Sequence, residues 1–490
     1  MLALVLLLAA GLRLWKIDSP IGGFQGLHEA HDTLIARHFL EGGSLLAPTP
    51  DGSHLSLETP PLLPYILLGI FRLTGVSIVA GRLVSVAASL GLVLVTFWLG
   101  RWLFSAAAGL AAAVLVAVTP VSVLAGRNIQ ADVLSLFFLA AAYFFWGRAE
   151  EGSAASRLAA GALAGAALSA SLFAAVGLAA LFAWEVGAHG LGFLRDKFRW
   201  AAAAIALAAP ALFYGYHLSR DSASVRRGAM GLAAAAVLPT DATALRAIGL
   251  EALWALSPLV AVLLVAGALA ALARPSPATL FALLPLLFFA VFSLFLHRYG
   301  YHLLWLLPWG ALLAGRLIGG LPLRALRAVA LILVAASGAF VSAVDVCSMK
   351  LGFSEFAGLG RTAPEIPGEA HRYLVDREMW GGYASIISFY DPKARLTVAG
   401  DGPPADGESY LLVFVPPQAR IPQGGWLFER EHYGLELFGF TVSEAHVDPH
   451  FFLQGSYVFL RTGEPLDFGL KELKRHPALA LAPLGVAATR

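Results

Sequence analysis

The chain has 490 residues, of which 58% are hydrophobic and only 13% are charged. A soluble domain averages about 45–50% apolar residues, so this composition excludes an ordinary water-soluble protein. The net charge of +2 gives no reason to expect nucleic acid as a partner, and the single cysteine excludes an intrachain disulfide.

Long uncharged runs predict a bundle of membrane helices, since a span needs roughly 20 apolar residues. Residues 1–15 form a retained first span, because they lack a basic start and a cleavage site. Residues 61–74 either span the membrane or lie at its interface. We expect about 11 spans, at 1–15, 82–100, 104–123, 133–147, 158–172, 173–186, 200–218, 252–273, 278–296, 303–320 and 325–344.

The basic residues predict which loops face the cytoplasm, where Lys and Arg accumulate. Arg148 and Arg157 flank one loop, and three basic residues at 195–199 fill the next. Both loops lie inside only if the chain crosses twice between them, so residues 158–184 are a broken pair rather than one helix. Three polar segments then fall outside: the loop at 16–61, the region of Asp132 and the loop after Leu296.

The first outer loop, residues 16–80, concentrates ionisable side chains beside the membrane. Five of them fall within ten residues: His28, Glu29, His31, Asp32 and Arg37. The pattern from Glu29 to Glu41 predicts an interfacial helix, on which residues three and four apart share a face. Convergent side chains would make a site, whereas a solvated helix whose charges face water is the simpler alternative.

Metal binding is a weaker interpretation of the same loop. His28, His31, Asp32 and His38 are ligand types that suit zinc or manganese. No second spacing signal accompanies them, so we assign no metal and no cofactor and leave a divalent metal as an alternative.

The segment Arg127–Asp132 lies between two predicted spans. Asp132 precedes fifteen uncharged residues, and an acid at this depth needs a partner, for which Arg127 is the candidate. An Arg–Asp pair that only fixes two helix ends is the structural alternative.

The segment His297–His302 closes a hydrophobic hairpin. Its tyrosines, Tyr299 and Tyr301, are typical of the aromatic belt at a membrane interface. Two histidines and an arginine beside them favour a phosphate or lipid headgroup site.

After Val344 the chain gains glycine, proline and charge, with strand-like runs at 410–415 and 456–460. We expect a small extracytoplasmic α/β domain at 346–490, following a transmembrane domain at 1–345. The apolar tail at 477–484 is too short to span a membrane.

The order of these motifs resembles the GT-C glycosyltransferases, in particular bacterial relatives of protein O-mannosyltransferases and of the lipid A aminoarabinose transferase. The resemblance covers roughly residues 1–345. It rests on a span and an acidic loop followed by Glu-Thr-Pro-Pro-Leu-Leu-Pro-Tyr at 58–65, Gly-Arg-Leu-Val-Ser at 81–85, Leu-Gly-Arg at 99–101, Thr119-Pro120, Arg127–Asp132 and the aromatic hairpin.

The resemblance implies a polytopic, mainly α-helical enzyme in the cytoplasmic membrane of a bacterium. It would move a sugar from a polyprenyl-phosphate donor to a hydroxyl of a protein, lipid or glycan on the outer face. The family's Asp-Glu pair aligns with His28-Glu29, so Glu29 is the first candidate base and Asp32 its substitute. Glu58 and Asp132 match two further family acids.

The expected chemistry assigns the remaining residues. Proton removal from the acceptor needs a carboxylate, and the departing phosphate needs donors. Arg127, Tyr299, Tyr301 and His302 would hold the donor phosphate, and His28 and His31 would contact the acceptor or a metal. A lipid-linked sugar transporter or flippase is the alternative, although the chain lacks the repeats of that class. A non-catalytic relative that only binds lipid is the other alternative.

Overall fold

The structure is a computed structural model in which two compact units are distinguished. One unit contains Met1–Ile17 and Ile35–Ala343, and the other contains Asp18–Leu34 and Val344–Arg490. The described residues are 1–21, 25–46, 60–149, 153–220, 252–253, 255–295, 300–346, 371–375, 385–398, 409–414, 426–437, 440–441 and 470–483.

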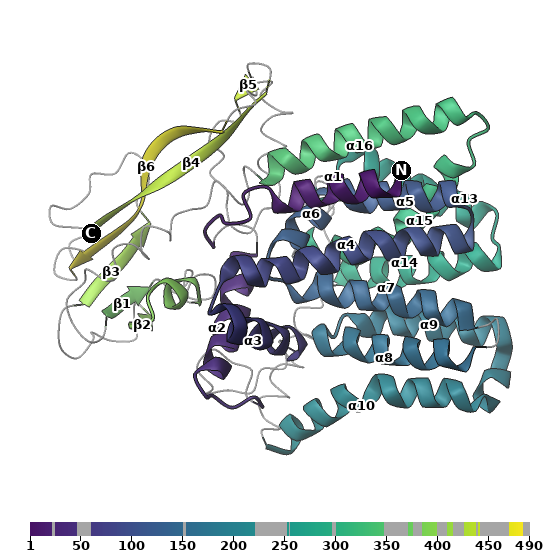
Figure 1. Ribbon diagram of the computed structural model, residues 1–490, viewed down its shortest axis with the longest axis horizontal. Coiled ribbons are helices and arrows are strands. Elements are labelled where there is room, and N and C mark those ends of the chain that lie inside the picture. Colours follow the sequence, from purple (N-terminus) through teal and green to yellow (C-terminus); the bar gives the residue numbers. More distant parts are fainter. Residues whose placement is uncertain are drawn as a thin grey trace. The chain divides into compact units, whose positions relative to one another are not determined.

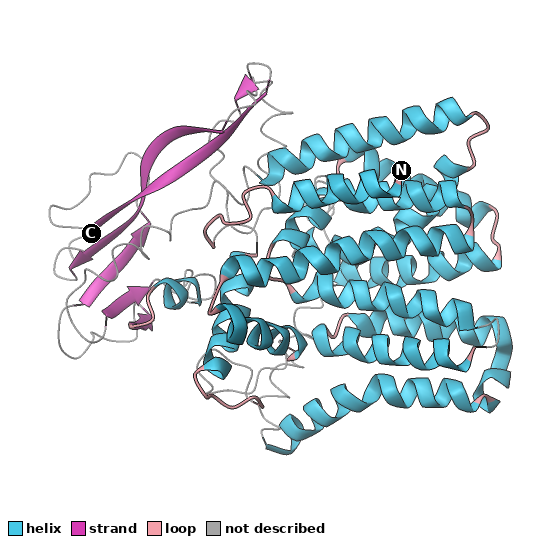
Figure 2. Ribbon diagram, viewed as in Figure 1, coloured by secondary structure: helices cyan, strands magenta, loops and turns pink. Residues whose placement is uncertain are grey.

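The first unit is a bundle of helices that run alongside one another (Figures 1 and 2). Helix α2 (Gly26–Leu40) is divided between the units at Leu34, and α16 ends just beyond the first unit. The bundle elements are α1 (Leu2–Leu14), α3 (Leu62–Thr74), α4 (Ile78–Leu103), α5 (Ala106–Val118), α6 (Pro120–Arg127), α7 (Ala131–Ala149), α8 (Ala154–Ala170), α9 (Ala174–His189), η1 (Gly190–Arg195), α10 (Lys197–Arg220), α13 (Pro258–Ala273), α14 (Pro277–Phe295), η2 (Gly300–Trp305), α15 (Leu307–Gly319) and α16 (Arg324–Val346).

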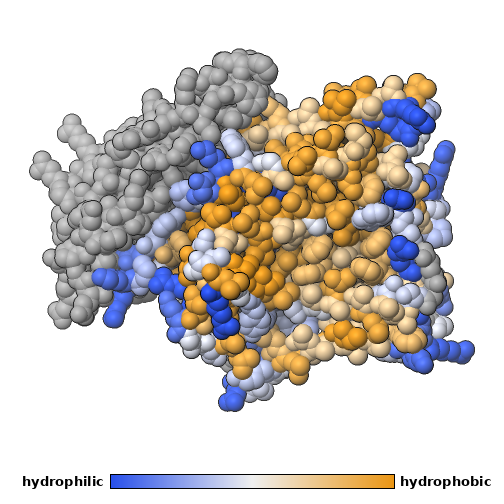
Figure 3. All heavy atoms as spheres, in the orientation of Figure 1, coloured by the Kyte–Doolittle hydropathy of each residue, from blue (hydrophilic) through white to orange (hydrophobic). Residues whose placement is uncertain are grey.

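The outside of the bundle is apolar. Leu212 is 77% exposed and Ile332 is 65% exposed, although both are large hydrophobic residues on long helices. Figure 3 shows apolar side chains over much of the bundle, with hydrophilic ones at the helix ends on the right of the view. Such a surface suits lipid rather than water, so the chain is a polytopic membrane protein.

Helix length separates the bundle into long and short elements. Among the described residues α4, α7, α10 and α16 are long and apolar enough to span a membrane, and α5 with α6 adds a fifth if the bent pair counts as one span. The ambiguous segment at 61–74 is the 13-residue helix α3. The number of about 11 spans stays a prediction.

The predicted break within 158–184 is confirmed. Helix α8 ends at Ala170 and α9 begins at Ala174, with Ser171 in an extended conformation between them. Hydropathy alone does not reveal this break, because residues 158–184 carry no charge. The basic residues on both sides of the segment predicted the break.

The span expected at 104–123 is broken in the structure. The chain bends by 63° between α5 and α6. Pro120 begins α6, and Thr119 before it is extended with ψ of 130°. A residue before proline disfavours the helical conformation, and proline has no N–H to continue the hydrogen-bond ladder. Helix α6 is therefore a separate element that ends at Arg127.

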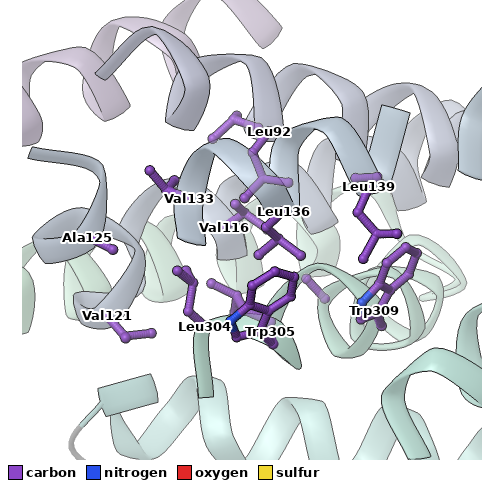
Figure 4. Packing of buried hydrophobic residues seen from close by; sticks show 14 of the residues in the cluster. Leu92, Val116, Val121, Ala125, Val133, Leu136, Leu139, Leu304, Trp305 and Trp309 are labelled. Carbon is purple, nitrogen blue, oxygen red and sulfur yellow. The ribbon is translucent and has the colours of Figure 1, made fainter. Parts of the chain in front are cut away.

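Large aromatic side chains fill the core where α7 meets η2 and α15. Figure 4 shows Trp305 and Trp309 beside Leu136 and Leu139 of α7. The rings of Trp309 and Tyr143 have centroids 4.5 Å apart, and Trp305 stacks on Phe289 at 5.3 Å. These contacts fix the segment from η2 into α15 against the rest of the bundle.

Small residues bring α5 close to its neighbours. A Cβ added at Gly109 would overlap the carbonyl oxygen of Phe97 on α4, and one at Gly315 of α15 would lie 2.5 Å from the carbonyl oxygen of Ala108. Close backbone approach of this kind is how membrane helices gain packing energy without a hydrophobic driving force between them.

Replacement of Gly109 by alanine is expected to destabilise the bundle by about 1–3 kcal/mol, because the added methyl group forces α4 and α5 apart. Thermal unfolding in detergent measures the loss. Gly69→Ala on α3 is the matched control, since no atom lies within 4 Å of its added Cβ. Equal melting temperatures for the two variants would contradict this packing.

The second unit contains a six-stranded sheet with strand order β2-β1-β3-β6-β4-β5. Strand β1 pairs in parallel with β2 and β3, and β6 pairs antiparallel with β3 and β4. The strand bounds are β1 (His371–Val375), β2 (Ala394–Val398), β3 (Ser409–Phe414), β4 (Trp426–Leu437), β5 (Phe440–Thr441) and β6 (Leu470–Pro483).

Parts of the sheet coincide with segments singled out from the sequence. Strand β3 overlaps the strand expected at 410–415, and β6 contains most of the apolar tail at 477–484. The strand expected at 456–460 lies outside the described residues. The segment 18–34 belongs to this unit, and its Ile21 N–H donates to Tyr390 Oη at 2.7 Å.

Candidate active-site residues

Helix α2 buries two of the candidate carboxylates. It begins at Gly26, three residues before the predicted start. Glu29 is 0% exposed and Asp32 is 5% exposed, and each makes polar or electrostatic contacts. The two lie three residues apart and therefore share a helix face. The alternative in which these charges simply face water is wrong for both, because a buried carboxylate requires partners.

The three histidines of α2, His28, His31 and His38, are more accessible than the two carboxylates. His28 is exposed and His31 is half-buried. Desolvation by the surrounding protein lowers the pKa of His28. The charge of nearby His31 lowers this pKa further. His28 is therefore neutral at pH 7, so it can accept a hydrogen bond from a hydroxyl group.

The residue that follows α2, Glu41, is an exposed carboxylate. Glu41 forms an ion pair with Arg37 at 2.8 Å, and its side chain is 58% exposed. On the other face, Ile35 and Phe39 pack with Leu68 of α3. Glu41 is thus a solvated surface acid, unlike Glu29.

The predicted pair between Arg127 and Asp132 is wrong. The Arg127 Nη2 group donates to the carbonyl oxygens of Trp15 at 2.7 Å and Lys16 at 3.0 Å. Asp132 instead accepts hydrogen bonds from Gln130, at 3.4 Å, and from Ser171. Helix α6 ends at Arg127, so its side chain reaches back to the end of α1, whereas Asp132 opens α7.

Asp132 and His302 belong to one neighbourhood of the bundle, at the break between α8 and α9. Ser171, which bonds to Asp132, lies in that break. Two residues later the ring of Phe173 meets the imidazole of His302, with centroids 5.1 Å apart. Within the bundle, Asp132 and His302 therefore both lie beside this break.

The hairpin residues are placed by the short helix η2. His302 is 7% exposed and Tyr301 is half-buried, with their rings 4.3 Å apart. Tyr299 lies outside the described residues, as does the candidate acid Glu58. No three His, Cys, Asp or Glu side chains in the described part of the chain lie close enough to bind a metal ion.

Sequence reasoning missed several buried polar residues at this end of the bundle. Arg13 and Arg82 are both fully buried, and Arg82 Nη1 donates to the Ile17 carbonyl at 2.6 Å. A lone arginine in an apolar run is itself a signal, because such a residue is costly in a membrane. Ser171 had no comparable signal, since serine is common in membrane helices.

A cavity of about 260 Å³ lies elsewhere, between α7, α8, α9 and α10. Its walls are almost wholly apolar, and the ion pair of Glu185 with Arg199, at 2.8 Å, lines it. It is at the other end of these helices from Asp132 and includes none of the candidate site residues. The cavity therefore gives no support to the predicted site.

Comparison with known proteins extends these observations. Residues 58–214 match the family model described as dolichyl-phosphate-mannose-protein mannosyltransferase. No curated protein sequence matches the chain significantly.

Solved structures match over most of the chain. ArnT from Cupriavidus metallidurans in the apo state has a TM-score of 0.60 at 15% identity, and the match covers 81% of this chain and 85% of that one. The same protein bound to undecaprenyl phosphate has a TM-score of 0.59 at 16% identity, with the same coverage.

A second neighbour is the oligosaccharyltransferase AglB from Archaeoglobus fulgidus, in complex with an inhibitory peptide and a dolichol-phosphate. Its TM-score is 0.55 at 14% identity, over 80% of this chain and 63% of that one. These matches confirm the predicted resemblance at the level of architecture. The chain shares the fold of these solved structures and resembles the GT-C membrane glycosyltransferases.

Proposed function

We propose that this protein is an integral-membrane glycosyltransferase that moves a sugar from a polyprenyl-phosphate donor to a hydroxyl acceptor. The observation that carries the proposal is the burial of Glu29 and Asp32 on one short helix, in a chain with the GT-C fold. A buried carboxylate pair is costly, so its presence favours a catalytic or binding role.

Glu29 is the proposed general base. It deprotonates or orients the acceptor hydroxyl while the sugar leaves the lipid phosphate from the opposite side. Asp32, one helical turn away, orients Glu29 or replaces it. Glu58 is a further candidate acid, and His28 and His31 are proposed to contact the acceptor.

Asp132 is the alternative to Glu29 for orienting or deprotonating the acceptor, whereas the aromatic hairpin serves the donor. Tyr299, Tyr301 and His302 donate to the departing phosphate, which develops charge as the glycosidic bond breaks. Arg127 is a weaker candidate than the sequence suggested, because its Nη2 group is already bound to two carbonyl groups.

The proposed location is the cytoplasmic membrane of a bacterium, with the reaction on the outer face. The concentration of basic residues at 195–199 supports this orientation. We further propose a transmembrane domain at 1–345 and an extracytoplasmic α/β domain at 346–490. The undecaprenyl phosphate bound to ArnT supports a polyprenyl-phosphate donor.

The decisive experiment incubates the purified protein with several polyprenyl-phosphate sugars and with hydroxyl acceptors of the protein, lipid and glycan classes. Acceptor-dependent release of polyprenyl phosphate, followed by mass spectrometry, is the expected result. Movement of an intact donor across proteoliposomes without consumption would identify a flippase. Donor binding without either reaction would identify a non-catalytic relative.

A further inference from the structure

Arg13 is a fully buried guanidinium in the last turn of the apolar helix α1. A charged group at such a position is costly unless its polar atoms are satisfied. Arginine has five N–H donors in a rigid plane, so the number and direction of its acceptors can be checked.

Five hydrogen bonds satisfy all five donors without a carboxylate. Nε donates to Ser89 Oγ at 2.7 Å. Nη1 donates to the carbonyl oxygens of Ala9 and Ala117 at 3.0 and 2.9 Å. Nη2 donates to the hydroxyl and the carbonyl of Ser122 at 3.0 and 3.3 Å. One side chain therefore joins α1 to α4, α5 and α6.

The bonds of Arg13 bracket the bend between α5 and α6. Ala117 precedes the bend and Ser122 follows it. In an unbroken helix the Ala117 carbonyl would accept from the N–H of residue 121. Since the chain bends by 63° at Thr119–Pro120, Arg13 provides the donor for this carbonyl instead.

The C-terminal end of α6 is also hydrogen-bonded to the end of α1. Arg127 donates to the carbonyls of Trp15 and Lys16, just after α1. Between the two ties, a Cβ added at Gly126 would lie 2.5 Å from Ser89 Oγ and 2.7 Å from Arg13 Nε. Helix α6 is thus held against α1 at its start and at its end.

Further hydrogen bonds connect the segment just after α6 to Asp132 and to α4. The Gln130 N–H donates to Ser85 Oγ of α4 at 3.2 Å, and the Gln130 side chain donates to Asp132 at 3.4 Å. Only the three residues Asn128–Gln130 separate α6 from α7, so a displacement of α6 moves the start of α7.

We propose that Arg13 is a positioning residue of the transfer site, which holds α6 at its bend and thereby fixes the α6–α7 connection that carries Asp132. The part that concerns transfer rests on the proposed function. The hold on α6 is independent of it and can be measured without any substrate.

The test compares Arg13→Met with Arg13→Lys by amide hydrogen exchange and by sugar transfer. In Arg13→Met the amides that follow Pro120, up to residue 131, should exchange about tenfold faster, because α6 loses its hydrogen bonds to Arg13 of α1. Transfer should fall about tenfold. Lysine restores a charge and up to three donors, so Arg13→Lys should recover part of both.

Tyr143→Phe is the matched control, since it also removes a buried hydrogen bond, the one from Tyr143 Oη to the Gly177 carbonyl. Exchange at 120–131 should not change in this variant. If Arg13→Met does not fold, Ser122→Ala removes one acceptor of the same guanidinium, and Gly126→Ala crowds it.

Three outcomes are decisive. Unchanged exchange at 120–131 in a folded Arg13→Met or Ser122→Ala protein overturns the hold on α6. Faster exchange with full transfer overturns the positioning role. Absence of transfer in the unaltered protein counts against the proposed function alone, because the exchange result still decides whether Arg13 holds α6.

Discussion

Glu29→Gln is expected to reduce sugar transfer by about a hundredfold to ten-thousandfold, the range that a general base contributes. Glutamine has nearly the same size, but its amide cannot take the proton from the attacking hydroxyl group. Because Glu29 is fully buried, the melting temperature of the variant is measured beside its activity, which separates loss of the base from loss of folding. Initial rates of donor consumption at saturating acceptor measure the effect.

Glu41→Gln is the matched control for this variant. Glu41 is the residue just after α2 and has the same chemistry, but it is 58% exposed and paired with Arg37. Its replacement should change transfer less than twofold and stability by at most about 1 kcal/mol. Full transfer by Glu29→Gln would remove Glu29 from the mechanism and move attention to Asp32.

Asp132→Asn is the second change with a large expected effect, a fall in transfer of about a hundredfold or more, because asparagine cannot take a proton from the acceptor. Asparagine retains an oxygen that can accept the hydrogen bond from Ser171, so the start of α7 should keep its place. What is lost is the negative charge beside the break between α8 and α9. The turnover rate of the purified variant measures the loss. An unchanged melting temperature shows that the variant is folded.

Ser171→Ala separates the charge of Asp132 from its orientation. This variant keeps the carboxylate but removes one hydrogen bond, so transfer should fall only about threefold to tenfold. If Ser171→Ala were as inactive as Asp132→Asn, the orientation of Asp132 would matter more than its charge. Wild-type rates in both variants would exclude Asp132 from the reaction.

The helices of this protein could be predicted from the sequence, because their signal is local. Hydropathy identified the apolar segments, and basic residues identified the break near Ser171. The break at Thr119–Pro120 was missed because the run from Trp102 to Gly126 has no charge and satisfies the length of a span. Proline in a membrane helix is common, so its presence did not by itself predict a bend of 63°.

The partners of the site residues could not be predicted, because they depend on how distant helices meet. Arg127 and Asp132 are five residues apart in sequence, which made a pair between them attractive. The bend before α6 and the short connection after it direct them to α1 and to the α8–α9 break respectively. Burial of Glu29 likewise follows from packing that no local pattern encodes.

The five hydrogen bonds of Arg13 also affect how the protein is assembled in the membrane. Helix α1 is synthesised before its partners, since Ser89, Ala117 and Ser122 follow Arg13 by 76, 104 and 109 residues. Until those helices arrive, the guanidinium in the last turn of α1 lacks these acceptors, and its long side chain can extend toward the interface. We therefore expect α1 to insert at a shallow depth and to reach its final depth only when α6 folds against it.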